Sequence, residues 1–247
     1  MALICPWRVG REFEIGRAPS ELREVKDREL GAVVTLYHCK NARSFRALWA
    51  LEEIGLSYEL KLLPFPPRFL APDYLQINPL GTIPLLIDGN VRMTESAAIC
   101  QYLADRYSKS VLALGPDDPD YGSYLNALHF GEATLTFPQT IVLRYGSLEP
   151  PDRRLPQAAT DYTRWTLGRM RAFADALADA EYAAAGRFTA ADISVGYALM
   201  LARIIGLGDQ IPTRLQSYYD RLECRPAFGR ALSAQSQALA ANEQPGA

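Results

Sequence analysis

The sequence predicts a small α/β domain followed by an all-helical domain. Strand-type and helix-type segments alternate from residue 33 to about residue 107, whereas no convincing strand occurs beyond residue 120. A stretch that contains Gly115, Pro116 and Pro119 separates the two halves and is typical of a linker. We therefore expect an α/β domain over residues 33–109, a linker over 110–120 and a helical domain over 121–247.

The α/β half begins with a β-branched and aromatic run, Val33–Tyr37, which predicts a strand. Apolar residues then recur at helical spacing between Asn41 and Gly55, and glycine is a common residue just past a helix end. A second strand is expected over Ser57–Leu63, because prolines follow it directly. This first part therefore has the order strand, helix, strand.

The rest of this half follows an irregular segment. Two strands, over Ile83–Ile87 and Val91–Met93, are joined by an Asp-Gly-Asn turn. Thr94 is expected to cap a helix that ends near Tyr107.

Helical patterns fill the second half. The expected helices are a long run interrupted at Pro138 and three later segments: Tyr121–Tyr145, Leu155–Glu181, Thr189–Ile205 and Pro212–Leu222. Thr189 and Asp192 have the spacing of a capping box, which is a folding signal. Residues 1–32 are rich in charge and poor in apolar side chains, so we expect a poorly ordered extension and assign it no function.

Composition excludes several classes of function. The chain has 26 basic and 28 acidic side chains, so it lacks the basic excess of a nucleic-acid binder. No run of apolar residues is long enough to span a membrane. The four cysteines and two histidines do not have zinc-ligand spacing, so we expect no metal. Scattered cysteines without paired spacing fit a reducing compartment and a cytoplasmic location.

Pro84 opens an otherwise apolar strand, where a proline is unusual. Two explanations are equally consistent with its position. A cis Ile83–Pro84 bond would leave the Ile83 backbone free to bind an extended peptide, whereas an ordinary trans proline would start an edge strand.

Thr94-Glu95-Ser96 places a carboxylate and a hydroxyl beside the free N–H groups of a helix start. Such a helix end can bind a carboxylate while Glu95 accepts an ammonium, so together they suit the zwitterionic end of an amino acid. Helix capping alone also explains all of these residues, and it is the simpler explanation.

The turn from Tyr37 to Ser44 leads from the first strand into the first helix. The N-terminal end of a helix favours a thiolate, which is either that of Cys39 or that of a ligand. The simpler roles are a helix N-cap for Asn41 and a small buried apolar side chain for Cys39.

Four segments in this order resemble the cytosolic glutathione S-transferase superfamily, from about Val33 to about Ala234. They are the TLY strand with the RSFRALWALEEIG helix, NPLGTIPLL, TESAAICQYLADRY and FTAADISVGYAL. The resemblance implies an N-terminal thioredoxin-like domain, a C-terminal helical bundle, a homodimer and a role in detoxification. It also implies that Ile83, next to a cis Pro84, pairs with the cysteine of glutathione, and that Glu95 and Ser96 hold the γ-glutamyl end.

The resemblance departs from the family at the position that faces the glutathione sulfur. Asn41 stands where related classes have a catalytic serine, and Arg43 where one class has a cysteine. We therefore assign thiol activation to Asn41, Arg43 and Ser44. Arg68, in a proline-rich segment, is a further expected glutathione ligand.

The leading hypothesis is a transferase that stabilises the glutathione thiolate at the start of the first helix and adds it to an electrophilic, apolar substrate. Alternatives are a glutathione-dependent isomerase, reductase or lyase, and a non-catalytic glutathione-binding module. Four side chains of the helical domain are expected in the core or in the second substrate's pocket: Tyr121, Tyr124, Leu128 and Phe137.

Overall fold

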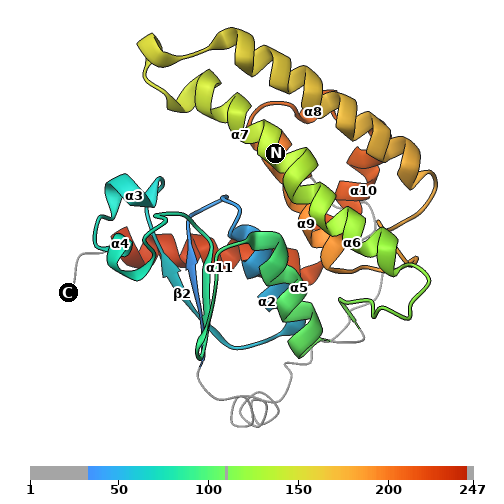
Figure 1. Cartoon of the computed structure of the whole chain (residues 1–247), viewed down its shortest axis with the longest axis horizontal. Helices are drawn as coiled ribbons and strands as arrows, with labels where there is room; N and C mark the ends of the chain where they lie inside the picture. The colour runs from blue at the N-terminus through green and yellow to red at the C-terminus, as the bar shows by residue number, and fades with distance from the viewer. Residues whose placement is uncertain (1–32, 109–110, 244–247) are drawn as a thin grey trace.

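The computed structural model describes residues 33–108 and 111–243, with side-chain environments up to residue 238. The extension expected over residues 1–32 lies outside the described residues. The chain forms a four-stranded sheet with helices, followed by a bundle of helices (Figure 1). The boundary at 110–120 stays a prediction; its described part lies between the last helix of the sheet region and the first helix of the bundle.

The sheet has the strand order β2-β1-β3-β4. β1 pairs in parallel with β2 and antiparallel with β3, and β3 pairs antiparallel with β4. This mixed sheet with its crossover helix is thioredoxin-like, as the sequence predicts. The strands are β1 (Val34–His38), β2 (Tyr58–Leu62), β3 (Leu85–Asp88) and β4 (Val91–Met93).

Helices connect and cover the sheet. α2 (Phe45–Ile54) is the crossover between β1 and β2, and it ends at Gly55, whose φ of +69° is the left-handed conformation that glycine adopts easily. Two short helices, α3 (Pro67–Leu70) and α4 (Tyr74–Ile77), occupy the irregular segment. The helix α5 (Ser96–Tyr107) packs against α2.

The second half is a helical bundle in the described residues beyond 120. A nearly continuous rod passes through α6, the π-helix η1 and α7, because the interruption expected at Pro138 is instead an N-terminal position of α7. The elements are α6 (Tyr121–His129), η1 (Phe130–Thr136), α7 (Phe137–Leu143), η2 (Arg144–Leu148), η3 (Pro151–Arg153), α8 (Pro156–Leu177), α9 (Ala190–Ile204), η4 (Gly208–Gln210) and α10 (Thr213–Glu223).

α9 is the central helix of the bundle and its start confirms the predicted capping box. Thr189 accepts a hydrogen bond from the Ala191 N–H, and the Asp192 carboxylate accepts one from the Thr189 N–H. Asp192 also accepts hydrogen bonds from the Ala183 N–H and the Tyr218 hydroxyl, so one buried carboxylate links three segments.

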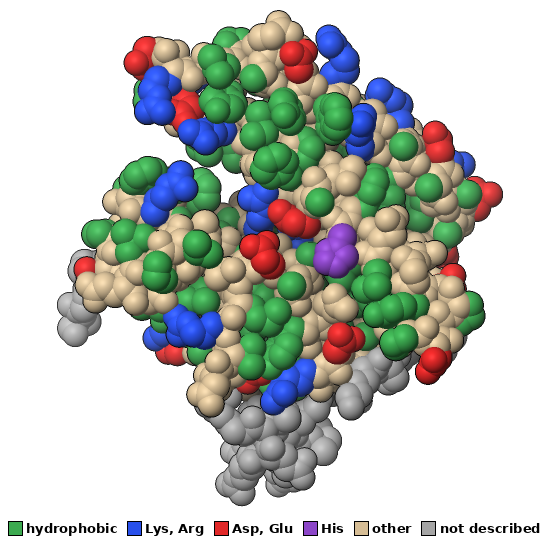
Figure 2. Space-filling view, in the orientation of Figure 1, with side chains coloured by type: hydrophobic (Ala, Val, Ile, Leu, Met, Phe, Trp, Pro, Cys, Tyr) green, Lys and Arg blue, Asp and Glu red, His purple; other side chains and the backbone are tan. Residues whose placement is uncertain are grey.

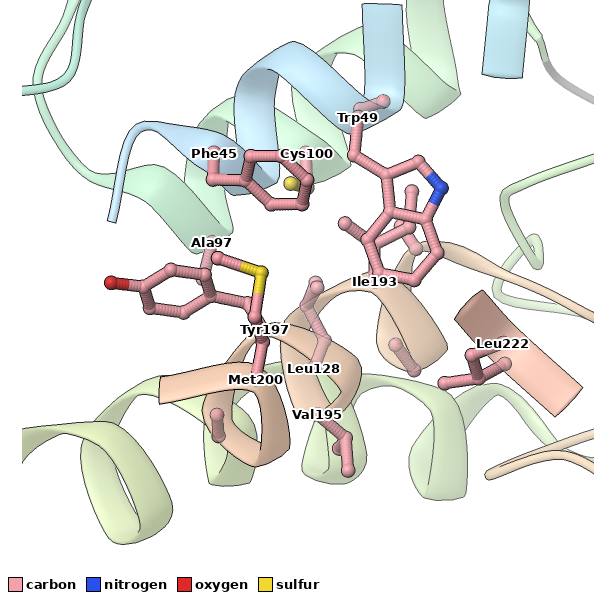
Figure 3. Close-up of a cluster of buried hydrophobic side chains, with 14 of the residues drawn as sticks. Phe45, Trp49, Ala97, Cys100, Leu128, Ile193, Val195, Tyr197, Met200 and Leu222 are labelled. Carbon is pink, nitrogen blue, oxygen red and sulfur yellow. The ribbon is translucent and has the colours of Figure 1, made fainter. Parts of the chain in front are cut away.

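One core joins the two halves. Side chains of α2, α5, α6, α9 and α10 meet in it, among them Phe45 and Trp49 from α2 and Tyr197 from α9 (Figure 3). Gly196 allows this close approach, because a Cβ there would lie 2.9 Å from the Trp49 ring. Tyr124 and Leu128 are fully buried in this core.

A final helix, α11 (Pro226–Glu243), returns to the sheet half. It packs on α2 and β2, and Figure 1 shows it running alongside the sheet, away from the other helices of the bundle. Phe228 of α11 stacks edge-on with both Phe45 and Trp49. The sequence pattern did not predict this helix.

Candidate glutathione site

Strand register brings the segment before β3 to the end of β1. Tyr37 of β1 lies opposite Leu85 of β3 in an antiparallel pair. Because the pair is antiparallel, Ile83 and Pro84, which precede β3, lie toward the end of β1 that leads into the β1–α2 turn. The Ile83–Pro84 bond is cis, the first of the two alternatives that the sequence left open. Within the described part of the chain, no hydrogen bond engages the Ile83 N–H or C=O.

The neighbouring pair brings the start of α5 to the same place. Leu86 of β3 lies opposite Met93 of β4. Because this pair is antiparallel too, Glu95, which follows β4, lies toward the end of the sheet where Pro84 precedes β3. The N-cap of α5 is Glu95 and not Thr94 as predicted, because the residue with extended backbone angles before the first helical residue is Glu95. Ser96 is therefore the first residue of the helix.

Two side-chain hydrogen bonds hold the loop that contains Ile83. The Tyr74 hydroxyl and the Asn78 side-chain amide both donate to the carbonyl of Thr82, at 2.9 and 2.8 Å. Gly81 has a φ of +59° and lies against α3, where an added Cβ would meet the Cβ of Arg68 at 2.7 Å. Arg68 itself is exposed beside this loop, and its guanidinium lies over the Phe69 ring, 4.9 Å from the ring centroid.

The β1–α2 turn differs from the predicted helix. α2 begins at Phe45, not at Asn41, and residues 40–44 form turns. The reason is the φ of +58° at Asn41, a left-handed conformation that cannot continue into a right-handed helix. Asparagine tolerates this conformation better than most residues. Asn41 is therefore not the N-cap, and its side chain is not consumed by capping.

Every polar group of Asn41 except one is held by the protein. Its N–H donates to Gln235 Oε1 at 3.1 Å, and its side-chain Oδ1 accepts from Gln235 Nε2 at 2.9 Å. Its carbonyl accepts from the Tyr197 hydroxyl at 3.2 Å. No partner for the side-chain Nδ2 occurs among the described residues. Since Asn41 is partly exposed, this N–H₂ group is a donor free for a ligand.

Ser44 does not join the other predicted thiol-activating residues at the surface. Its side chain is fully buried, and its hydroxyl lies 2.7 Å from His38 Nδ1 and accepts from the Cys39 N–H. Burial lowers the pKa of His38 to about 4, so the imidazole is neutral at pH 7. Ser44 and His38 thus stabilise the β1–α2 turn through buried hydrogen bonds.

The chain's own buried thiols are unreactive. Burial raises the pKa of Cys39 and that of Cys100 to about 12. Cys39 donates its S–H to the Pro64 carbonyl, which matches the simpler role considered for it. Because a thiolate is the reactive form, a nucleophilic sulfur at this turn comes from a ligand and not from Cys39.

A fully buried arginine lies beneath the turn. Arg46 donates to Glu132 and to the Ser96 hydroxyl, the latter at 3.2 Å. It also donates to the Thr136 hydroxyl at 2.6 Å and to the Ser194 carbonyl. Burial lowers the pKa of the Arg46 guanidinium while Glu132 opposes this, and the side chain remains a cation at neutral pH.

Glu132 connects two arginines. Its Oε1 accepts from Arg43 Nε at 2.6 Å, and its Oε2 binds Arg46. Two cations and one anion leave a net charge of +1 in this cluster, at the start of α2, where the helix dipole adds partial positive charge. A negative ligand group is therefore stabilised here.

Figure 2 shows a notch between the α3–α4 region and the α7 rod, with basic and acidic side chains together at its inner end. The elements that meet there carry Arg43 and Glu132, which are partly exposed, and Glu95, which is exposed. Phe137, at the start of α7, contributes an exposed apolar ring on the bundle side.

The structure thus links Arg43 to Ser96 through Glu132 and Arg46, and it directs Ile83, Pro84 and Glu95 to the end of the sheet that leads into the Asn41 turn. Sequence reasoning missed Arg46, Glu132 and Gln235. Arg46 had a signal, since a charged residue stands on the apolar face of the Phe45–Trp49 turn of the helix. Glu132 and Gln235 had none, because only the fold brings their helices to this place.

Among the described residues, no group of histidine, cysteine, aspartate or glutamate side chains is arranged to hold a metal ion. No helix in the described part of the chain has the length and apolarity needed to cross a membrane.

The sheet topology, the cis proline before β3 and the Glu-Ser helix start define a thioredoxin-like protein with a helical partner domain. Residues 32–105 match the family model described as "Glutathione S-transferase, N-terminal domain". Glutathione S-transferase 2 of Schizosaccharomyces pombe is 30% identical over 169 residues, which are 65% of this chain and 71% of that protein. The chain belongs to the glutathione S-transferase family.

Coverage of the relatives varies. Glutathione S-transferase 3 of Schizosaccharomyces pombe is 36% identical, over 42% of this chain and 43% of that protein, so this match spans less than half of each. Among solved structures, glutathione transferase URE2P6 of Phanerochaete chrysosporium in complex with oxidized glutathione superposes with a TM-score of 0.73. It is 26% identical, and the superposition covers 84% of this chain and 98% of the other.

Proposed function

We propose that this chain binds glutathione in the notch beside β3 and transfers it to an electrophilic, apolar substrate. The observation that supports the proposal is the direction of the two strand pairs, which leads the unpaired Ile83 backbone, Glu95 and the Asn41 turn toward the same end of the sheet. An extended tripeptide needs these three elements: a main-chain partner, a holder for its charged end and a donor near its sulfur.

The γ-glutamyl end is assigned to the start of α5. Glu95 accepts hydrogen bonds from its ammonium, and the free N–H groups of the helix start donate to its carboxylate. The Ser96 hydroxyl is held by Arg46, so the same cluster that pairs with Glu132 also fixes this end of the site. Arg68 is assigned to the glycine carboxylate as a charged donor from α3.

Asn41 is assigned to the sulfur. Its free Nδ2 donates to the thiolate, and the net positive Arg43–Arg46–Glu132 cluster lowers the thiol pKa from a distance. In the reaction the thiol proton leaves to solvent and the sulfur forms a bond to the electrophilic carbon. In a substitution the displaced bonding pair departs with the leaving group, whereas in an addition the π pair moves to the neighbouring atom, which takes a proton from solvent. The exposed Phe137 ring supports an apolar electrophile.

The glutathione-bound neighbour URE2P6 supports the choice of ligand. We also propose that the protein is a homodimer, acts in the cytoplasm and serves in detoxification, as the family relationship suggests. Sedimentation at micromolar concentration checks the dimer, and a monomer contradicts that part alone.

The test combines calorimetry with a thiolate titration at ultraviolet wavelengths. Wild-type protein is expected to bind glutathione, lower its thiol pKa and conjugate 1-chloro-2,4-dinitrobenzene. Glu95→Ala is expected to weaken glutathione binding by roughly 1.5–3 kcal/mol, the range for hydrogen bonds to charged groups. Glu59→Ala, an exposed change on β2, is the matched control and leaves binding unaltered.

Three outcomes discriminate the alternatives. Unchanged affinity in Glu95→Ala contradicts the site. Binding without a lowered thiol pKa favours the non-catalytic module. A lowered thiol pKa without conjugation, but with turnover of a disulfide or an isomerisable substrate, favours the reductase or isomerase alternatives.

A further inference from the structure

Gln235 of α11 contacts the Asn41 turn of the candidate site, although α11 is distant from that turn in the sequence. It is almost fully buried, yet it belongs to the last helix of the chain and lies 194 positions after Asn41. Its amide touches Asn41 twice, through the backbone N–H and through the side-chain oxygen. Ordinary packing needs neither contact, because a buried apolar side chain would fill the same space.

The polarity of these contacts is fixed by a backbone N–H. The Asn41 N–H can only donate, so the Gln235 atom 3.1 Å from it is the amide oxygen. The same oxygen lies 3.1 Å from His38 Nε2, and because an oxygen accepts, the proton of the neutral ring is on Nε2. The Gln235 oxygen is thus directed to His38 and to the Asn41 backbone.

With its oxygen so directed, Gln235 can offer only its N–H₂ group to the Asn41 side chain. That group selects the Asn41 Oδ1 and turns the Asn41 Nδ2 away from α11. An asparagine amide without this contact can rotate by half a turn and present either end, because its oxygen and nitrogen sides are similar in shape. An oxygen facing a thiolate would repel it, whereas an N–H₂ group stabilises it.

We infer that Gln235, oriented by the Asn41 N–H and by His38, is a positioning residue for thiol activation: it holds the Asn41 amide with its N–H₂ group toward the glutathione sulfur. The inference rests on the proposed function, since it concerns the same sulfur. Beyond that function, we infer that the lowering of the thiol pKa at the Asn41 turn depends on α11, a helix from outside the sheet half.

The decisive variant is Gln235→Glu. The new carboxylate keeps the acceptor that His38 and the Asn41 N–H need, but it puts a second acceptor opposite Asn41 Oδ1. The Asn41 amide then turns and presents its oxygen to the sulfur. The expected result is a rise of roughly one unit in the pKa of the bound glutathione thiol, which corresponds to about a tenfold loss of thiolate near neutral pH. kcat falls about tenfold, and the affinity for the thiol-free analogue γ-glutamyl-2-aminobutyrylglycine stays within about twofold, because the grip at Glu95 is untouched.

Gln237→Glu is the matched control. Gln237 lies one half-turn further along α11 and is exposed, so the same chemical change on the same helix is expected to alter neither thiol pKa nor kcat. Gln235→Met is a second variant, whose side chain has a similar volume but makes no hydrogen bond. It keeps the test valid if the charged Gln235→Glu variant misfolds. It is expected to raise the thiol pKa by a smaller amount, because the Asn41 amide then samples both orientations.

A second background shows whether Gln235 acts through Asn41. Asn41→Gly removes the amide while glycine keeps the left-handed backbone conformation without strain. In this background Gln235→Met is expected to cause no additional rise in the thiol pKa, as a coupled pair requires. An equal additional rise overturns the inference, since Gln235 then acts by another route.

The outcomes separate the two proposals. A wild-type protein that binds glutathione without lowering its thiol pKa contradicts the proposed function, and the inference falls with it. A wild-type protein that lowers the thiol pKa, together with Gln235→Glu and Gln235→Met proteins that are folded by circular dichroism and lower it equally well, overturns the inference alone.

Discussion

The guanidinium of Arg46 lies over the ring of Tyr197, 4.4 Å from the ring centroid, and both side chains are buried. Arg46 belongs to α2 of the sheet half and Tyr197 to α9 of the bundle. The same tyrosine donates its hydroxyl to the Asn41 carbonyl. One ring thus contacts both the cation beneath the site and the turn above it, so the bundle sets the shape of the site as directly as the sheet does.

Removing this cation is expected to destabilise the fold strongly. Arg46→Met removes the buried partner of Glu132 and the donor to the Thr136 hydroxyl and the Ser194 carbonyl in the core. The expected loss in the free energy of unfolding is about 3 kcal/mol, typical of breaking a buried ion pair from one side. Urea denaturation measures it.

Arg164→Met on α8 is the control for this prediction. Arg164 makes an exposed pair with Asp161, and such pairs contribute about 0–1 kcal/mol. A loss in Arg46→Met no larger than that in Arg164→Met would contradict the structural role of the cluster.

Acid is expected to weaken the fold through His38. The pKa of His38 is about 4 in the folded chain against 6.5 for an ordinary histidine, so between these values the unfolded chain binds more protons. The contribution of His38 to the free energy of unfolding is therefore fully present above pH 6.5. It is lost as the pH drops toward 4, and its size is on the order of 3 kcal/mol. Urea unfolding at intervals of half a pH unit measures the slope.

Two variants isolate this contribution. His38→Gln is expected to flatten the slope between pH 6.5 and 4, because glutamine does not titrate. His129→Gln changes the only other histidine, which is exposed on α6, and leaves the slope as it is. A slope in His38→Gln equal to that of the wild type would exclude His38 as its source.

Packing between the π-helix η1 and α9 depends on a glycine. A Cβ at Gly131 would lie 2.6 Å from the backbone carbon and 2.8 Å from the backbone oxygen of Ser194. Because backbone atoms cannot move aside like a flexible side chain, Gly131→Ala is expected to lower the unfolding free energy by about 1–3 kcal/mol. It also shifts Glu132, so glutathione binding weakens with it.

Gly122→Ala tests the same substitution in open space. Gly122 lies in α6, and a Cβ there meets nothing within 4 Å. Its expected effect is a gain of about 0.5–1 kcal/mol, because alanine favours the helix. Thermal melts of the two variants should therefore move in opposite directions, and a parallel shift would contradict the packing argument.

Local patterns were sufficient to predict much of this molecule. The strand-helix-strand order, the Thr189–Asp192 capping box and the Glu95-Ser96 helix start each depend on neighbouring residues, and each appears in the structure. The errors were also local: a left-handed residue at position 41 delays α2 to Phe45, and this conformation has no reliable sequence signal.

The parts of the site that could not be predicted come from distant helices. Glu132 reaches Arg43 because η1 follows α6 in a π-helical path, and Gln235 reaches Asn41 because α11 leaves the bundle. Neither residue stands out in the sequence, since a single glutamate or glutamine on a helix is ordinarily solvated. Their roles arise only from packing between elements far apart in the chain.

The path of α11 has a consequence for synthesis. The turn at Asn41 is made early, but the side chain that completes its hydrogen bonds is translated 194 residues later. During elongation the sheet half can assemble while this loop still lacks its last partner. Under the proposed function, the corner that holds the glutathione sulfur is therefore complete only after α11 has been made and has packed against the sheet half.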